Sequence, residues 1–488
     1  MKYCILGAAK SGVSAAILAN TINNISCANN NSVTNNSENN LVFVRELLPQ
    51  ENFPNEIKLF DSLDIKYEFG AESQTQTKAE TILPDYDALI ISPGIPTDAP
   101  FILTAKKIGL PIYSEIEFAF QQIINPIIAI TGTNGKTTTT TLINYILNNA
   151  NVKSVEAGNI GTPLSEIATK ILNNNKNITK ETTIILEVSS YQLEFIEKFK
   201  PNVAVILNIT PDHLKYHKTM ENYIKAKLKI ASNQDENDIL ILNADDENIN
   251  CNNINNNSIE DFKKQHNIKS KIYQFSLSPV NRGIYVTDGK IINSLQQTKE
   301  EVMQTKEIKI PGIHNQYNSM AAAIVAKVWQ LSNEDIRDSL KKFNGVEHRL
   351  EFVKTINGAD YINDSKATNV NATWYALNSY ERPVVWIAGG RGDNNDYQML
   401  DKSVLQNVKQ IITFGEEKEA IFSHYASLLS CIKVDNIYNA VNIAYKAALP
   451  DDIVLFSPAC KSFDQFLNFE QRGECFKYAV HQLVGMLN

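Results

Sequence analysis

The stretch IIAITGTNGKT, residues 127–137, decides the fold class of this 488-residue chain. Its apolar run Ile127–Ile130 predicts a buried strand, and Thr138–Asn148 predicts the helix that follows. Between them, Gly132 and Gly135 allow backbone N–H groups to turn toward phosphate oxygens, and the helix N-terminus favours negative charge. The stretch therefore predicts a phosphate-binding loop between a strand and a helix.

The polar residues of this loop indicate the ligand. Lys136 supplies a point charge for the outer phosphates, and the Thr137 hydroxyl suits Mg²⁺. The strict eight-residue pattern begins with Gly, where this chain has Ile130. A chance glycine-rich turn is the alternative, but strand, loop, Lys-Thr and helix occur here in order. We therefore expect the loop to bind ATP with Mg²⁺.

Apolar runs of the same kind recur along the chain between longer amphipathic stretches. Many are rich in Val and Ile and lack alternation, as expected of parallel strands buried on both faces. This pattern predicts an α/β protein. Besides Ile127–Ile130, the predicted strands are Tyr3–Leu6, Leu41–Val44, Ala88–Ile91, Thr183–Val188, Val203–Ile209, Ile239–Leu242, Val384–Ala388, Ile411–Phe414 and Ile453–Ser457.

A hairpin and the chain length complete the fold prediction. Glu351–Ile356 and Ala359–Asn363 flank Asn357-Gly358, a pair typical of a type I′ turn. A chain of this length is too long to fold around a single hydrophobic core. We expect three domains: a Rossmann-like N-terminal domain, a central P-loop domain with a mostly parallel sheet and a Rossmann-like C-terminal domain. The predicted ranges are 1–125, 126–345 and 346–488.

Composition excludes several classes of protein. The net charge of -8 and pI near 5.6 disfavour a nucleic-acid or anionic-membrane partner. The six cysteines are scattered, which predicts free thiols in a reducing cytosol. The amino terminus does not resemble a signal peptide, and no run has the length of a membrane span. Three asparagine-rich segments, 23–40, 173–177 and 248–257, are predicted to be flexible surface insertions.

A second glycine-containing loop follows the first strand. Residues 7–12, GAAKSG, form a G-x-G-x-x-G pattern with Ala9 in place of the middle glycine. A dinucleotide pyrophosphate needs close backbone approach at that position, so Ala9 counts against NAD. The loop still permits another diphosphate at the helix start, and a purely structural turn remains the alternative.

Further polar residues follow predicted strands or lie in predicted helices. Glu187 closes an apolar run and is well placed as a metal ligand near bound phosphates. Asp212-His213 follows the strand 203–209. Lys227 lies in the helical stretch 222–230 with two other lysines, which by itself looks like an ordinary solvated helix face.

The last third of the chain carries four polar motifs: His314-Asn315 with Asn318, His348-Arg349, the run NDSKATN at 363–369, and SPACKSFDQF at 457–466. The last motif follows a predicted strand, and a polar loop at the carboxyl end of a strand is a natural ligand site.

Together these motifs resemble the Mur ligases. TGTNGKTTTT, GNIG, LEVSSYQLE, DH, KAKLK, GIHNQYN, HRLE, NDSKATN and SPACKSFDQFLNFEQRG occur in the family's order, from Lys2 to the C-terminus apart from the insertions. The last two motifs, and the absence of an Asn-Pro-Arg motif, favour the D-glutamate-adding branch. The resemblance implies an ATP-dependent amide ligase of cytoplasmic peptidoglycan synthesis, which joins D-glutamate to UDP-N-acetylmuramoyl-L-alanine through an acyl phosphate and a tetrahedral intermediate.

The resemblance also implies residue roles. Lys136, Glu187, His213 and Lys227 would be catalytic. ATP would be bound by Gly132, Thr133, Asn134, Gly135, Lys136, Thr137, Thr138, Asn315, Asn318, Arg349 and Asp364. Mg²⁺ would be held by Thr137, Glu187, His213 and Lys227, the last as the carbamate N6-carboxylysine. The UDP-substrate would face Ser11, Gly12, Ser92, Gly94 and Asn159. D-Glutamate would lie near Lys366, Thr368, Ser462, Phe469 and Arg391.

Two positions depart from the family's pattern. The second strand ends in Arg45-Glu46, where the family has an Asp-containing or Thr-Arg segment that contacts uridine. Asp393 stands where some members have a lysine near the D-glutamate carboxylate, and we expect Arg391 to substitute for it. A monomer is the default expectation.

Three other functions are compatible with parts of the sequence. A folylpolyglutamate synthase shares the phosphate loop but should lack the UDP-binding first domain and the loop at 457–466. A P-loop switch or transport ATPase would release phosphate without an amino-acid acceptor. An NAD-linked oxidoreductase would use the first loop, and Ala9 disfavours it.

Overall fold

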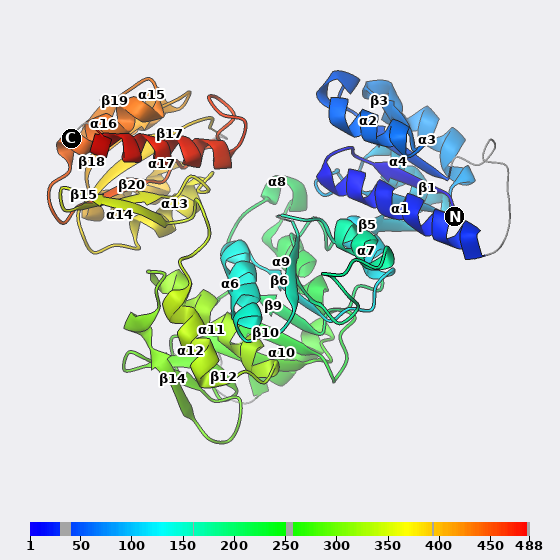
Figure 1. Cartoon of the computed structure of the whole chain (residues 1–488), viewed down its shortest axis with the longest axis horizontal. Helices are drawn as coiled ribbons and strands as arrows, with labels where there is room; N and C mark the ends of the chain where they lie inside the picture. The colour runs from blue at the N-terminus through cyan, green and yellow to red at the C-terminus, as the bar shows by residue number, and fades with distance from the viewer. Residues whose placement is uncertain (30–40, 160, 250–256, 393–394, 486–488) are drawn as a thin grey trace. The chain divides into compact units, whose positions relative to one another are not determined.

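The residues that the structure describes form three β-sheets (Figure 1). The chain divides into two compact units. The computed structural model describes residues 1–29, 41–159, 161–249, 257–392 and 395–485. The first unit comprises Met1–Met303 and Met320–Ser339, and the second comprises Gln304–Ser319 and Leu340–Asn488. Within the described ranges, no helix combines the length and apolar character needed to cross a membrane.

The first sheet is parallel, with the strand order β3-β2-β1-β4-β5. Residues of β1 alternate between two apolar layers: Cys4 and Leu6 pack with α3 and α4, and Tyr3 and Ile5 pack with α1. Both faces are therefore buried, as the uninterrupted apolar runs predict. The elements are β1 (Tyr3–Leu6), α1 (Lys10–Asn29), β2 (Val42–Glu46), α2 (Pro54–Ser62), β3 (Lys66–Phe69), α3 (Gln76–Ile82), β4 (Ala88–Ile91), α4 (Pro100–Ile108), β5 (Ile112–Ser114) and α5 (Glu115–Phe120).

The prediction for the asparagine-rich segment 23–40 is wrong at its start. Residues 23–29 continue helix α1, and Asn23 is buried, where it accepts a hydrogen bond from the amino terminus. Low helix propensity was overridden here by packing of the preceding turns. Residues 173–177 are exposed after α7 (Leu164–Leu172), as expected, and residues 30–40 and 250–256 lie outside the described ranges.

The second sheet has nine strands in the order β14-β13-β12-β11-β10-β9-β6-β8-β7. Pairing is parallel from β7 to β12 and antiparallel between β12 and β13. Its strands are β6 (Ile127–Thr131), β7 (Ser154–Gly158), β8 (Thr183–Glu187), β9 (Val203–Ile206), β10 (Ile239–Asn243), β11 (Lys271–Ser276), β12 (Gly283–Thr287), β13 (Lys290–Asn293) and β14 (Glu300–Gln304). Its remaining helices are α6 (Lys136–Asn149), α8 (Leu214–His217), α9 (Met220–Leu228), α10 (Asn257–His266), α11 (Ile313–Val328) and α12 (Asn333–Lys342).

Two buried carboxylates of α5 join the first sheet's domain to the second within the first unit. Glu117 accepts hydrogen bonds from the backbone N–H groups of residues 197–199 at 2.8–3.0 Å. Glu115 is 1% exposed, and its Oε1 accepts the N–H of Ser165 at 2.6 Å, in the first turn of α7. This carboxylate thus satisfies an N–H group that a helix start leaves without an intrahelical partner.

The third sheet has the order β15-β16-β20-β17-β18-β19. The hairpin β15–β16 is antiparallel, and Asn357 and Gly358 have φ of 50° and 81°, which confirms the predicted turn. The other pairs are parallel, and successive residues of β17 alternate between two apolar layers on its two faces. The elements are β15 (Glu351–Ile356), β16 (Ala359–Asn363), α13 (Val370–Leu377), β17 (Val384–Gly389), α14 (Asp401–Asn407), β18 (Val408–Phe414), α15 (Lys418–Tyr425), β19 (Ser430–Lys433), α16 (Ile437–Ala447), β20 (Ile453–Phe456) and α17 (Phe469–Gly485).

Candidate active site

The predicted phosphate loop joins β6 to α6. Gly132 and Gly135 have φ of 157° and 85°, and Gly135 immediately precedes the helix in the left-handed conformation. A Cβ on Gly132 would lie 3.0 Å from the Cβ of Leu207, so glycine permits the close approach. The Lys136 ammonium folds back over the loop and donates to the carbonyls of Gly132 and Thr133 at 2.9 and 2.8 Å.

The segment after β9 fixes the shape of this loop. Asn208 accepts the N–H of Asn134 through Oδ1 at 2.8 Å and donates to the Asn134 carbonyl through Nδ2 at 3.0 Å. The Thr133 N–H donates to the Asn208 carbonyl at 2.8 Å, and the Thr133 hydroxyl lies 3.1 Å from the Tyr223 hydroxyl. Both Asn208 and Tyr223 thus support the loop.

Lys227 points into the protein. It is 1% exposed, its ammonium donates to the Gly132 carbonyl at 2.8 Å, and it lies 4.7 Å from the ring centroid of Tyr223. Burial, and then the charge of Lys136, lower the pKa of Lys227 well below its usual value, with Asp212 opposing them. The interpretation of these lysines as a solvated helix face is therefore wrong for Lys227. It holds for Lys225, which is exposed and pairs with Glu221 at 2.6 Å.

Glu187 lies at the end of β8, in register with Ile130 of the neighbouring strand. It is 2% exposed, and its Oε1 accepts a hydrogen bond from Asn159 Nδ2 at 3.2 Å. In the described part of the chain, its Oε2 is buried without a hydrogen-bond partner. A carboxylate oxygen is a hard ligand of the kind that Mg²⁺ prefers, so this atom fits the predicted metal role.

His213 begins α8 with φ of 55° and packs against Tyr191 and Tyr223, at ring distances of 5.0 and 6.3 Å. Burial lowers its pKa; Asp212 opposes this shift, and the charges of Lys136 and Lys227 reinforce it. A neutral imidazole can offer a lone pair to a metal ion, so His213 also fits its predicted role.

The loop after β1 is closely packed. A Cβ on Gly12 would lie 1.9 Å from the Gly7 carbonyl, and a Cβ on Gly7 would lie 2.6 Å from Ser92 Oγ. Ser92 Oγ is buried and has no hydrogen-bond partner among the described residues. Lys10, in the first turn of α1, donates to the Gly161 carbonyl at 2.5 Å. Ser92, which follows β4, therefore places an unsatisfied hydroxyl beside this loop. Ser11 is half-buried next to Gly12, and Gly94 has φ of 89°.

The departure at Arg45-Glu46 has a structural explanation. Arg45 is 4% exposed, forms an ion pair with Glu68 and stacks on Phe43, with its guanidinium carbon 4.3 Å from the ring centroid. Glu46 accepts the N–H of Ala8 at 2.8 Å. Arg45 thus stabilises the first sheet, and Glu46 holds the first loop.

In the second unit, Asp364 and Arg349 form the polar group at the end of β16. Asp364 is 5% exposed and accepts hydrogen bonds from Ser457 Oγ at 2.8 Å and the Leu350 N–H at 3.2 Å. Burial raises the pKa of Asp364 to about 7, against the Ser457 hydrogen bond and the Arg349 charge. Arg349 Nε is buried without a hydrogen-bond partner within the described ranges.

Asn315 and Asn318 lie together in the first two turns of α11. Asn318 Nδ2 donates to Asn315 Oδ1 at 3.1 Å, and Asn315 Nδ2 donates to the Pro311 carbonyl at 2.7 Å. Both side chains are buried, which gives them fixed orientations.

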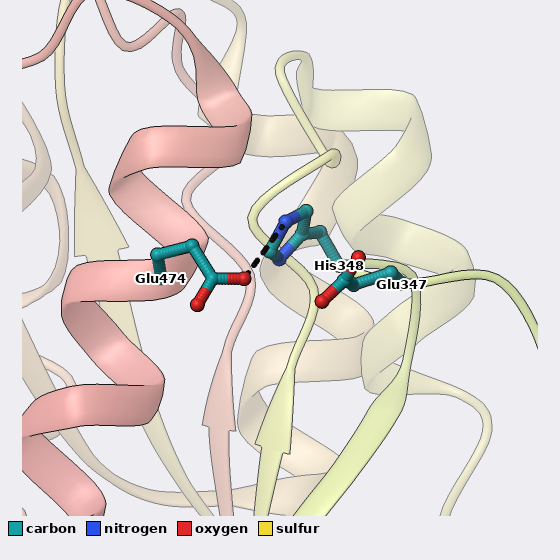
Figure 2. Close-up of side chains that lie close together, drawn as sticks. All are labelled: Glu347, His348 and Glu474. Atoms are coloured by element: carbon teal, nitrogen blue, oxygen red, sulfur yellow. Dashed lines mark ion pairs between the residues drawn. The ribbon is translucent and has the colours of Figure 1, made fainter.

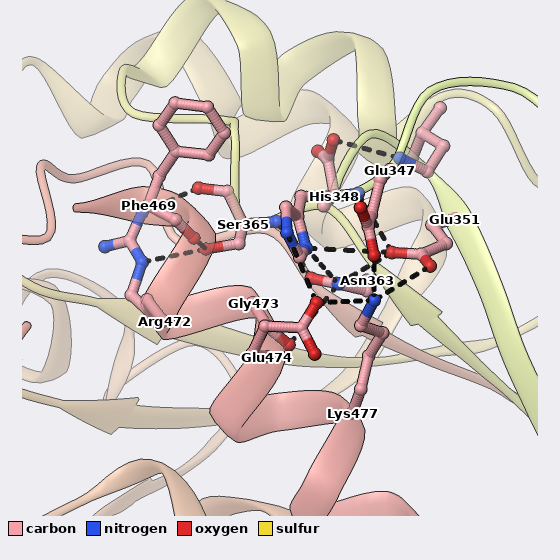
Figure 3. A network of polar contacts seen from close by, with 12 residues as sticks. Glu347, His348, Glu351, Asn363, Ser365, Phe469, Arg472, Gly473, Glu474 and Lys477 are labelled. Atoms are coloured by element: carbon pink, nitrogen blue, oxygen red, sulfur yellow. Dashed lines mark hydrogen bonds and ion pairs between the residues drawn. The ribbon is translucent and has the colours of Figure 1, made fainter.

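Three of the residues predicted to bind D-glutamate, Lys366, Thr368 and Ser462, lie on two loops that Arg472 connects. Arg472 is fully buried and donates to Ser365 Oγ at 3.1 Å and to the Ser365 carbonyl at 2.7 Å (Figure 3). It also donates to the carbonyls of Cys460 and Lys461 at 3.0 and 3.1 Å. Lys366 lies above the Phe469 ring, with Nζ 5.5 Å from its centroid. The guanidinium thereby fixes the loops that carry Lys366, Thr368 and Ser462.

The Arg391 side chain pairs with Glu416. Its Nε and Nη2 donate to the two carboxylate oxygens at 3.0 and 2.9 Å, and its backbone forms an antiparallel bridge with Lys461. The bridge keeps Arg391 beside the loop at 457–466. Asp393 lies outside the described residues.

One further cluster has metal-like composition. Glu347, His348 and Glu474 each place a ligand atom within 4.8 Å of the others (Figure 2). Lys477 forms ion pairs with both carboxylates, at 2.7 Å for Glu474. Since the Lys477 ammonium already pairs with both carboxylates, we do not treat this cluster as a metal centre.

Comparison with known proteins identifies the family. The sequence matches the Mur ligase middle domain over residues 130–326 and the Mur ligase glutamate ligase domain over residues 348–460. It is 40% identical to the UDP-N-acetylmuramoylalanine–D-glutamate ligase of Salinibacter ruber, over 87% of this chain and 89% of that protein. The chain belongs to the Mur ligase family. The ligase of the same name from Natranaerobius thermophilus is 36% identical over 99% of this chain and 98% of its own length.

Solved structures confirm the Mur ligase fold. The UDP-N-acetylmuramate–alanine ligase of Thermotoga maritima aligns over 100% of this chain and 99% of its own, with a TM-score of 0.53 and 17% identity. At that identity the likeness supports the fold alone: α/β domains with largely parallel sheets.

The structure of this Mur ligase gathers predicted residues into two groups, one in each unit. The first unit brings together the phosphate loop, Glu187, His213 and Lys227, and the second brings together Arg349 with Asp364 and the two loops joined by Arg472. Sequence reasoning missed Asn208, Tyr223 and Arg472. Asn208 follows a predicted strand next to the phosphate loop, and Arg472 lies in the quoted run FEQRG, so their positions were visible although their contacts were not.

Proposed function

We propose that this Mur ligase adds D-glutamate to UDP-N-acetylmuramoyl-L-alanine at the expense of ATP. The products are UDP-N-acetylmuramoyl-L-alanyl-D-glutamate, ADP and phosphate, and the reaction would serve cytoplasmic peptidoglycan precursor synthesis. The proposal is supported by relatives named UDP-N-acetylmuramoylalanine–D-glutamate ligase, which align with 81–99% of the chain at 36–41% identity.

The chemistry requires a carboxylate to be activated. Phosphoryl transfer from ATP converts the alanyl carboxylate to an acyl phosphate, the D-glutamate amine attacks its carbonyl carbon, and the tetrahedral intermediate expels phosphate. Transfer between two anions needs positive charge that is fixed in advance. The one observation that carries the assignment of this step is that the Lys136 ammonium is held over the phosphate loop by the carbonyls of Gly132 and Thr133.

The orphaned Glu187 oxygen and the depressed His213 pKa fit a divalent cation. Thr137, Glu187 and His213 would hold Mg²⁺, which supplies neutralisation of phosphate charge when bound. Lys136 would bind the ATP phosphates with the N–H groups of the loop. Glu187 Oε1 remains oriented by Asn159, which also belongs to the predicted UDP-substrate residues.

Lys227 is the residue that we propose to be carbamylated. Carbamate formation requires a neutral amine, which attacks CO₂ and releases a proton. The depressed pKa of Lys227 provides that neutral form. The product would be N6-carboxylysine, an anion able to bind Mg²⁺ and to balance Lys136.

We assign the remaining roles by domain. Residues 1–125 would bind the UDP-substrate through the first loop, Ser92 and Gly94, with Asn159 contributed by the next domain. Residues 126–345 would bind ATP, and residues 346–488 would bind D-glutamate through Lys366, Thr368, Ser462 and Phe469, with Arg391 beside them.

The test is phosphate release with UDP-N-acetylmuramoyl-L-alanine and single amino acids as acceptors. We expect D-glutamate to stimulate release, and L-glutamate or L-lysine to leave it at the background rate. Equal stimulation by L-glutamate would refute the assignment. Activity with a glutamate-extended folate would instead favour a folylpolyglutamate synthase, and release that ignores every acceptor would indicate a simple ATPase.

A further inference from the structure

Lys477, on the C-terminal helix α17, is surrounded by the carboxylates of three glutamates (Figure 3). Its ammonium pairs with Glu347, with Glu474 at 2.7 Å and with Glu351 at 3.4 Å, and its side chain is 16% exposed. Burial alone would lower the pKa of Lys477, but the hydrogen bonds to Glu347 and Glu474 and the charges of Glu351 and Glu347 raise it above its usual value. The lysine is therefore held as a cation.

The carboxylates belong to two different segments. Glu474 is on α17, whereas Glu347 and Glu351 flank the turn that enters β15. Without Lys477, the negative charge of the helix would face the negative charge of the turn at short range, and like charges in a partly buried setting repel. The ammonium thus converts a repulsive junction into an attractive one.

The junction is also sterically close. A Cβ on Gly473 would lie 2.3 Å from His348 Nδ1, so the helix backbone directly contacts the His348 ring. The fully buried Asn363 amide donates to His348 Nδ1 at 3.0 Å and to Glu351 Oε2 at 2.9 Å. The turn is consequently fixed against α17 at several points.

The turn presents Arg349 in a constrained backbone. Its neighbours His348 and Leu350 have φ of 62° and 44°, a region that non-glycine residues rarely adopt without surrounding contacts to hold them. The Leu350 N–H donates to Asp364 Oδ1 at 3.2 Å. The conformation that sets Arg349 beside Asp364 therefore depends on what holds the turn.

We propose that Lys477 is a positioning residue for ATP binding, because its ion pairs hold the turn 347–351 against α17 and so orient Arg349. The inference rests on the proposed role of Arg349 and Asp364 in ATP binding. Lys477 itself acts only through that turn.

The experiment compares Lys477→Met, which keeps the aliphatic stem, with Lys477→Arg, which keeps the charge. For Lys477→Met we expect KM for ATP and Kd for a non-hydrolysable ATP analogue to rise roughly tenfold, which corresponds to about 1.4 kcal/mol of binding free energy. KM for D-glutamate should stay at the wild-type value, and Lys477→Arg should restore ATP binding. The control is Lys433→Met, which removes the more exposed pair with Glu419 at 3.0 Å and should change neither constant.

A second change separates positioning from simple loss of packing. Adding Glu474→Gln to Lys477→Met removes the repulsion across the junction and should recover part of the ATP affinity. If Lys477→Met does not fold, Glu347→Gln tests the same link and should produce a smaller selective rise. Wild-type ATP affinity in either folded single variant, or an equal rise for ATP and D-glutamate, would overturn the inference. The analogue Kd does not depend on the acceptor, so failure of D-glutamate to stimulate the wild-type protein would count against the proposed function alone.

Discussion

The ammonium groups of Lys136 and Lys227 donate to one carbonyl oxygen, that of Gly132, at 2.9 and 2.8 Å. Two cations this close to one acceptor repel each other, and burial adds to the cost of charging the inner one. Burial and the neighbouring charge of Lys136 therefore disfavour the charged form of Lys227. This asymmetry underlies the first two predictions.

Lys227→Ala should lose nearly all ligase activity, because the proposed carbamate can no longer form. Short carboxylates such as formate or acetate should restore part of the rate by occupying the vacated space as anions. The measurement is D-glutamate-dependent phosphate release with and without the added carboxylate. Lys225→Ala, two residues away and exposed, is the matched control and should behave as wild type. Wild-type rates in Lys227→Ala would refute the carbamate role.

Lys136→Ala should abolish measurable turnover, because the fixed charge that faces the developing phosphate charge is lost. Removal of one such group commonly costs about 10²- to 10³-fold in rate. Single-turnover formation of ADP checks the step directly. Lys170→Ala, which removes an exposed pair with Glu166 at 2.7 Å, should leave it unchanged. A variant that still formed ADP at the wild-type rate would show that the loop lysine is not needed for transfer.

Arg472→Lys should raise KM for D-glutamate by about tenfold or more, because one ammonium cannot bridge the loops at 365 and 460–461 as the planar guanidinium does. The affinity for an ATP analogue should change much less. Steady-state kinetics with each substrate varied in turn measures the split. Equal effects on both substrates would indicate general destabilisation, which thermal unfolding would report independently.

Glu115 should make stability depend on pH. Burial raises its pKa from an ordinary 4.5 to about 7, so between those values the folded state holds the proton more tightly than the unfolded state. Its contribution is therefore complete below about pH 4.5 and is lost as the pH rises toward 7, by up to about 3 kcal/mol. Glu115→Gln retains an acceptor for the Ser165 N–H and should flatten that part of the curve, so the variant gains stability over wild type above pH 7. Denaturant unfolding from pH 5 to 8 measures the difference, and parallel curves for the two proteins would contradict it.

The buried parallel strands were predictable because both faces of each strand require apolar residues, which leaves an uninterrupted run. Tyr3–Leu6 and Ala88–Ile91 match the structure at both ends, and the Asn357-Gly358 turn matches in conformation. The strand predicted to end at Ile209 ends at Ile206, since the following residues leave the sheet to support the phosphate loop. Strands β3, β5, β7, β11–β14 and β19 were missed. Five of them, β3, β5, β7, β14 and β19, are edge strands, which carry a weaker pattern.

Some site residues could likewise be predicted from the sequence, and others could not. Glu187 and the phosphate loop were visible as polar residues that end apolar runs. The inward direction of the Lys227 side chain could not be predicted. Residues 225, 227 and 229 are all lysines, and only tertiary packing determines which of them is buried. Arg472 contacts Ser365 and Tyr223 contacts Thr133, and these pairs are 107 and 90 residues apart in the chain, so no local spacing encodes them.

Asn208 uses both polar atoms of its amide on the backbone of Asn134, so hydrogen bonds within the protein set the shape of the phosphate loop. A nucleotide that binds such a loop does not have to order it. The conformational entropy of the loop is lost when the chain folds, and phosphate binding is correspondingly preorganised. In Asn208→Ala the free loop should be disordered, so nucleotide binding would have to order it. The entropic cost of this ordering should weaken nucleotide affinity.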